Sequence, residues 1–135
     1  MPDNTSGVQI KMKAFFVKAV LMGVIPFYRV EFPVDVLPKE FIYIEYDHGR
    51  ELGKRAIKED DEVYTKLKTL IVQEKEGWRY DLTTYAPNHT FNSAKMKINC
   101  IDNALVVNYE DGDSDWVQIS KKGVKGYCPQ VYLNR

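Results

Sequence analysis

The stretch Lys95–Tyr109, KMKINCIDNALVVNY, contains two apolar–polar alternations on either side of Asp102-Asn103. Asp and Asn both tolerate positive φ, which the two central residues of a tight hairpin turn require. The turn therefore predicts three facing pairs: Cys100 with Leu105, Ile98 with Val107, and Met96 with Tyr109. All six side chains lie on one face, so the turn chemistry and the hydrophobic pattern agree on a single register.

The sequence after this hairpin predicts a further strand, joined through the acidic segment Asp111–Asp113. If the loop ends at Asp113, Val117 faces Val107 and Ile119 faces Leu105, which continues the apolar face. The opposite face of these strands then carries polar and aromatic side chains, namely Asn108, Trp116 and Gln118.

Three upstream segments alternate between apolar and polar residues, as half-buried strands do. They are Val8–Ala14, Phe27–Phe32 and Trp78–Tyr85, the last of which reads WRYDLTTY. In WRYDLTTY every second residue, from Trp78 to Thr84, is expected to face the core. The remaining four residues are expected to face outward: Arg79, Asp81, Thr83 and Tyr85.

The segment Phe41–Tyr46, FIYIEY, is also expected to be a strand, with Ile42, Ile44 and Tyr46 toward the core. Tyr43 and Glu45 then point outward. Other segments are less regular. We expect Ala14–Ile25 to be a buried strand or a short buried helix, Asp47–Lys58 a loop or poor helix, Ala86–Ala94 a loop, and Val131–Leu133 an edge strand.

The clearest helix follows the acidic pair Asp60-Asp61, either of which can cap a helix start by accepting amide hydrogens. An apolar stripe at helical spacing comes next, formed by Val63, Leu67, Leu70 and Ile71. Gly77 suits the left-handed residue that commonly follows a helix C-terminus. This pattern predicts a helix that packs on a sheet through one face.

These elements predict an α+β fold: a twisted antiparallel sheet of about six strands packed on one main helix. A partly closed β-barrel around the helix is the alternative. The 135 residues, of which 44% are hydrophobic and 28% charged, suit a single globular domain over residues 1–135.

The formal net charge is zero, so we expect neither nucleic acid nor a membrane surface as a partner. The apolar run Ala14–Pro26 is too short to span a membrane. Lys11 and Lys13 precede it, as in a signal peptide, but ten mostly polar residues come first and no A-x-A site follows. A targeting role is therefore not expected.

The chain has two cysteines, Cys100 and Cys128, which are too few to staple a small secreted scaffold. We interpret them as free thiols in a reducing compartment and therefore expect a cytoplasmic protein. A single Cys100–Cys128 disulfide is the alternative.

No motif predicts a cofactor or metal. The residues from Asp111 to Asp115 have the D-x-D-x-D spacing of a calcium loop, but position 12 is Lys122 rather than glutamate. An acidic hairpin turn is the better interpretation. The two histidines, His48 and His89, are far apart and lack a ligand-like cysteine pair, which disfavours zinc.

Eight side chains are predicted to share the outer face of the sheet. Arg, Asn, acids and aromatics in this mixture are typical of a recognition surface or a small polar pocket. We list them as candidate binding residues: Tyr43, Glu45, Arg79, Asp81, Tyr85, Asn108, Trp116 and Gln118.

We therefore expect a small non-catalytic binding or interaction protein, of accessory or immunity type, whose partner is an unknown protein or small molecule. The alternative is a small enzyme with Asp81, Glu45 or His48 in a sheet-lined pocket. A homodimer is also expected, because open edge strands and aromatic faces both favour association.

Overall fold

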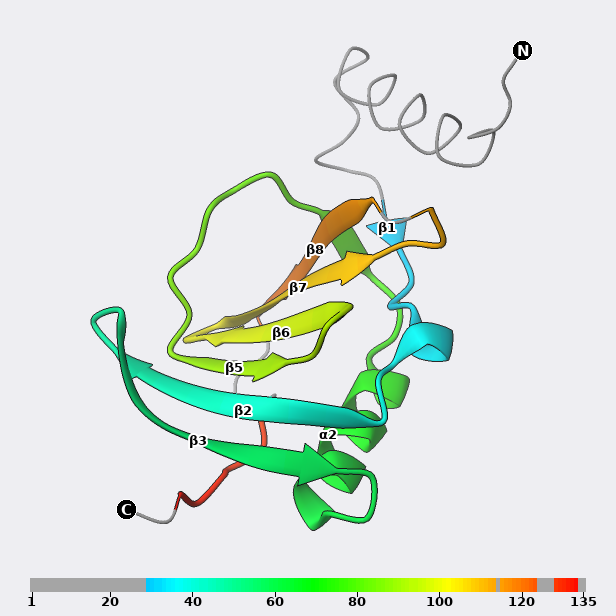
Figure 1. Cartoon of the computed structure of the whole chain (residues 1–135). Helices are drawn as coiled ribbons and strands as arrows, with labels where there is room; N and C mark the ends of the chain where they lie inside the picture. The colour runs from blue at the N-terminus through cyan, green and yellow to red at the C-terminus, as the bar shows by residue number, and fades with distance from the viewer. Residues whose placement is uncertain (1–28, 114, 124–127, 134–135) are drawn as a thin grey trace.

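The computed structural model describes residues 29–113, 115–123 and 128–133. The segments Val8–Ala14 and Ala14–Ile25 lie outside them. The described residues form one open eight-stranded antiparallel sheet and one α-helix, α2 (Glu62–Gln73), so the fold is α+β (Figure 1). The predicted count of about six strands was too low.

A 3₁₀ turn, η2, covers Val34–Val36. The strands are β1 (Arg29–Val30), β2 (Glu40–Asp47), β3 (Arg50–Lys58), β4 (Trp78–Tyr80), β5 (His89–Asn92), β6 (Met96–Ile101), β7 (Ala104–Glu110) and β8 (Trp116–Lys122).

The strand order across the sheet is β1-β4-β8-β7-β6-β5-β2-β3. Helix α2 follows β3 at one edge of the sheet and leads to β4, which lies next to the other edge. The sheet curves, and α2 packs on what we call its inner face (Figure 1). Buried residues of α2 and of most of the strands form one core there.

Helix α2 begins as predicted at Asp61, whose side chain accepts a hydrogen bond from the amide of Val63 at 2.8 Å. Of the predicted stripe, Val63, Leu67 and Ile71 are buried, but Leu70 is only half-buried. Tyr64 takes its place in the core and donates its hydroxyl to the carbonyl of Pro38 at 2.6 Å.

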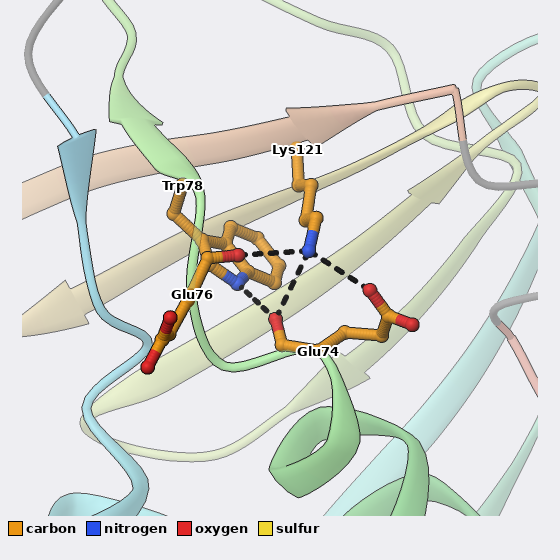
Figure 2. A network of polar contacts seen from close by, with 4 residues as sticks. All are labelled: Glu74, Glu76, Trp78 and Lys121. Atoms are coloured by element: carbon orange, nitrogen blue, oxygen red, sulfur yellow. Dashed lines mark hydrogen bonds and ion pairs between the residues drawn. The ribbon is translucent and has the colours of Figure 1, made fainter.

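The end of α2 is tied to the sheet by two side chains (Figure 2). The indole nitrogen of Trp78 donates to the carbonyl of Glu74 at 2.7 Å. The ammonium of Lys121 on β8 contacts the Glu74 carboxylate at 2.9 Å and the Glu76 carbonyl at 2.8 Å. A cation at a helix C-terminus satisfies free carbonyls and complements the helix dipole. Gly77 has the predicted positive φ, although it lies three residues beyond the cap, Glu74.

The β6–β7 hairpin has the predicted register, with Cys100 opposite Leu105, Ile98 opposite Val107 and Met96 opposite Tyr109. The predicted turn conformation was wrong, because neither Asp102 nor Asn103 has a positive φ. The next hairpin is shifted by two residues from the prediction, since Val107 faces Ile119 and Tyr109 faces Val117. The reason is a longer turn, in which the amide of Asp111 donates to the carbonyl of Asp115 at 2.9 Å. Because side chains alternate with period two, the shift leaves the same residues on the inner face.

Strand β3 was not predicted, because Asp47–Lys58 is polar. It pairs with β2 through His48-Gly49, and both turn residues have positive φ. The predicted faces of β2 were also wrong. Phe41 and Tyr43 are buried, whereas Ile42 is exposed. Both faces of FIYIEY are apolar, so alternation alone could not choose between them; the aromatic rings occupy the core, where both contact Phe91.

The predicted strand Trp78–Tyr85 ends after three residues. Asp81 terminates it, because its carboxylate accepts a hydrogen bond from the amide of Thr83 at 2.8 Å and so closes a turn. Leu82, expected in the core, is 65% exposed. The segment Ala86–Ala94, expected to be a loop, contains β5, which inserts between β2 and β6.

The prediction of free thiols was wrong: Cys100 and Cys128 form a disulfide. This bond holds the C-terminal segment on the inner face, where Val131 is buried. The end of the Leu133 side chain lies over Gly53 on β3, 2.9 Å from where a Cβ of that residue would be. The segment Val131–Leu133 is therefore a strap over the core rather than the predicted edge strand.

We predict that Leu67→Ala lowers the free energy of unfolding by about 2–5 kcal/mol, because Leu67 is 1% exposed at the centre of the α2 interface. Urea denaturation measures the change. The matched control is Leu52→Ala on β3, where the leucine is 39% exposed and a much smaller effect is expected. A loss below about 1 kcal/mol at Leu67 would contradict this packing.

We also predict that Cys128→Ser costs roughly 3–4 kcal/mol, as the chain-entropy account gives for opening a loop of this length; the two cysteines are 28 residues apart. Reducing agent should destabilise the wild-type protein equally and leave the variant unchanged. Thiol titration of the denatured, non-reduced protein should count zero, and a count of two would contradict the disulfide.

Candidate functional site

Six of the eight predicted binding residues share the outer face of the sheet, opposite α2. Trp116, Gln118 and Ser120 alternate along β8 on this face, because Val117 and Ile119 pack in the core. Asn108 lies opposite Gln118 on β7, and Arg79 on β4 lies opposite Ser120. The structure brings together Arg79, Asp81, Tyr85, Asn108, Trp116 and Gln118.

A ladder of side-chain hydrogen bonds crosses this face from β5 to β8. Asn99 on β6 donates to the carbonyl oxygen of the Asn108 side chain at 3.0 Å, and Asn108 donates to Gln118 at 2.8 Å. Thr90 begins the ladder with a 3.3 Å bond to Asn99. These bonds satisfy each amide and hold it in one orientation. The outer face is therefore a fixed pattern of polar groups.

The ladder continues into the loop after β4. The amide nitrogen of Gln118 donates to the backbone carbonyls of Asp81 at 3.0 Å and Thr83 at 2.7 Å. The Tyr85 hydroxyl donates to the Asp81 carboxylate at 2.7 Å. The loop that ends WRYDLTTY is thus anchored to β8, which explains how residues far apart in sequence form one surface.

Asp81 is the ionised centre of this corner. Burial raises its pKa, but hydrogen bonds from Ser120, Thr83 and Tyr85 to the charged carboxylate outweigh burial, so its pKa is lowered overall. Burial and the bond to Asp81 raise the pKa of the Tyr85 phenol. Asp81 therefore acts as an ionised acceptor that orients its neighbours.

A pocket of about 560 Å³ opens where β1, β4 and β8 meet. This volume is within the range of small-ligand sites. Its lining is strongly basic: Arg29, Arg79, Lys121 and Lys122, with Gly77, Tyr80, Asp81, Thr83 and Ser120 completing it. Arg29, Ser120 and Lys122 were not among the residues predicted from the sequence. The signal for Arg29 was its outward position in the alternation of Phe27–Phe32, but the pairing of β1 with β4 could not be anticipated.

Tyr43 and Glu45 do not belong to this surface. Tyr43 is 3% exposed on the inner face, and its hydroxyl lies 2.7 Å from Nδ1 of His89. Glu45 lies opposite His89, on the same side of β2 as Tyr43. Their assignment to the outer face was wrong because the faces of β2 are reversed.

The candidate catalytic residues do not converge. His48 lies in the exposed β2–β3 turn beside Asp47, at 2.8 Å, whereas Glu45 lies on the inner side and Asp81 on the outer face. Within residues 29–113, 115–123 and 128–133, no group of three or more His, Cys, Asp or Glu side chains could hold a metal ion. No helix in the same part of the chain is long and apolar enough to span a membrane.

Comparison of the chain with protein-family models, curated protein sequences and solved structures gave no match. The geometry of the outer face is therefore the basis for inferring function.

We predict that Asp81→Asn lowers the free energy of unfolding at pH 7 by roughly 1–2 kcal/mol, since hydrogen bonds to a charged acceptor are stronger. A carboxylate whose pKa is lower in the native state than in the unfolded state stabilises the fold at pH values above its unfolded pKa. This stabilisation is lost as the pH falls through its native pKa. The difference between wild type and variant should thus hold at neutral pH and shrink as the pH falls below 3.8, the ordinary pKa of an aspartate side chain.

Urea denaturation at pH values from 7 down to 3 measures this difference. Tyr85→Phe is the companion variant: it removes one donor to Asp81 and should reproduce part of the loss at pH 7. A wild-type advantage that stays constant down to pH 3 would contradict the proposed role of the ionised Asp81.

Proposed function

We propose that this protein is a small binding protein, of accessory or immunity type, that recognises its partner through the outer face of the sheet. The observation that carries the proposal is the hydrogen-bond ladder from Thr90 to Gln118 together with the anchored Asp81–Tyr85 loop. Groups that are already held in place lose little conformational entropy on binding. A pre-organised polar face beside a half-exposed tryptophan is a favourable recognition surface.

Trp116 supplies the apolar part of this surface. Its side chain is 49% exposed on the outer face, two positions from Gln118, which links the ladder to the loop after β4. Aromatic side chains bury a large area at low entropic cost and are frequent at the centre of interfaces. The polar ladder would then provide direction, and Trp116 much of the buried area.

A small enzyme is the second function considered, and the geometry supports it less. A general acid or base at neutral pH is helped by a pKa close to 7. The pKa of Asp81 is lowered instead, and Glu45 and His48 lie elsewhere. Binding therefore explains the arrangement better than catalysis.

For the partner we propose a protein or a small molecule rather than nucleic acid or a membrane surface, because the chain is neutral overall. A second copy of the chain is one such protein, so we retain a homodimer as a proposal. The route through the C-terminal edge no longer applies, because Val131 is buried on the inner face. The outer face remains available as a route.

The expectation of a cytoplasmic protein depended on free thiols. Disulfides persist mainly in oxidising compartments such as the cell exterior or the periplasm. Since Cys100 and Cys128 are bonded, we propose an oxidising compartment. A thiol count on protein alkylated within its host cells tests this location, and two reactive thiols would overturn it.

We predict that a photoreactive benzoylphenylalanine in place of Trp116 forms a covalent adduct with the partner in an extract of the native host. The same residue at Val72 is the matched control, because Val72 is 45% exposed on the far side of α2. Adducts at both positions or at neither would contradict the outer face as the binding surface.

The purified variant, illuminated alone, tests self-association with the same probe. A dimer through the outer face gives a cross-linked species of twice the chain mass at position 116 and none at position 72. A purely monomeric product, with an adduct in the extract, assigns the face to a different partner.

A further inference from the structure

Two arginines face each other at the basic pocket. Arg29 on β1 and Arg79 on β4 are directly opposite in the strand register, and both are exposed. Like charges in this position repel each other and weaken strand pairing. Among the described residues, neither arginine takes part in an ion pair. The pairing of β1 with β4 therefore brings together two positive charges that have no ion-pair partner among residues 29–113, 115–123 and 128–133.

A third base adds to this charge from the neighbouring strand. Lys122 is on β8, two residues from Ser120, which lies opposite Arg79. Lys122 also lacks an ion pair within the part of the chain that the structure describes. The three free bases therefore approach one pocket from β1, β4 and β8.

The other charged side chains that line the pocket, Lys121 and Asp81, already have partners within the protein. The ammonium of Lys121 contacts the Glu74 carboxylate and the carbonyls of Glu74 and Glu76 (Figure 2). The carboxylate of Asp81 accepts hydrogen bonds from Ser120, Thr83 and Tyr85 rather than from an arginine. Neither side chain compensates the three free bases.

Several bases elsewhere on the chain do have acidic partners. Arg55 contacts Asp61 at 2.6 Å, and Lys66 contacts Glu62 at 3.1 Å. What distinguishes the β1–β4–β8 corner is that three bases without an ion pair among the described residues line one pocket, two of them directly opposite each other. An anion held between the bases would remove the repulsion between Arg29 and Arg79.

We propose that this pocket binds a phosphate-type tetrahedral oxyanion, either free or as the terminal group of a small ligand. The inference rests on the proposed binding function of the outer face and names the chemistry of its ligand. Guanidinium groups bind phosphate oxygens in pairs of parallel hydrogen bonds. Three bases from three strands suit the three free oxygens of a phosphoryl group better than the two oxygens of a carboxylate.

Isothermal titration calorimetry with inorganic phosphate, in a buffer free of other multivalent anions, tests the proposal. Wild type should bind one phosphate, and Arg79→Gln should weaken the affinity by about tenfold or more, since a bidentate charged contact is lost. Arg50→Gln is the control, because Arg50 is exposed at the start of β3 and far from the pocket in the strand order. Its affinity should equal that of wild type.

Thermal unfolding separates an anion-binding role of Arg79 from a purely structural one. In the absence of anion, the two roles predict opposite shifts of the unfolding midpoint for Arg79→Gln. Without an anion, Arg79→Gln should unfold at the same or a higher temperature than wild type, because the repulsion from Arg29 is removed. Phosphate should raise the midpoint of wild type and of Arg50→Gln but not of Arg79→Gln. A lower midpoint of Arg79→Gln without anion would count against the proposal.

Two further ligands define the chemistry and its source. Phenyl phosphate binding more tightly than inorganic phosphate indicates a terminal group on a small ligand, whereas equal or weaker binding indicates the free ion. Acetate should not compete with phosphate, and competition at equal concentration would overturn the assignment to a tetrahedral anion. No heat with phosphate or phenyl phosphate would also overturn it, while an adduct at position 116 would leave the wider binding function standing.

Discussion

The fold depends on one connection, the helix that carries the chain from β3 at one edge of the sheet to β4 beside the other. In a flat sheet the six strand spacings between them would span roughly 29 Å, whereas a 12-residue helix is about 18 Å long. The links at its two ends cover part of the difference, and curvature of the sheet brings the strands closer. A curved sheet then encloses the apolar side of α2, which a short helix needs in order to be stable in water.

Both ends of this connection are secured by polar contacts. Asp61 caps the start of α2 and also binds Arg55 on β3. At the other end, Trp78 and Lys121 bind the last carbonyls, so the helix, β4 and β8 are joined at one point (Figure 2). The Cys100–Cys128 disulfide holds the C-terminal strap across the same inner face. The inner face is therefore committed to stability, and our proposal assigns recognition to the outer face.

Parts of the outer face could be predicted from alternation alone. Asn108, Trp116 and Gln118 were placed correctly even though the β7–β8 register was shifted, because a shift of two residues preserves the face. Arg79 and Asp81 were also placed correctly. Tyr43 and Glu45 were not, since both faces of FIYIEY are apolar. The basic pocket was not predicted, because Arg29, Arg79 and Lys122 come from three separate segments. No local sequence pattern indicates the order of these segments in the sheet.

The sequence by itself determined the register of the β6–β7 hairpin and the N-terminus of α2, because an apolar alternation around a short turn and a helix cap both act on neighbours within a few positions. Only the tertiary structure decided that WRYDLTTY ends as a strand at Asp81, that Cys128 reaches Cys100, and that Arg29 faces Arg79. Each of these depends on which distant segment lies alongside. The arrangement of distant segments depends on burial of the whole core around α2. The stability of that core is the sum of small contributions from many residues, so it cannot be predicted from any short stretch of sequence.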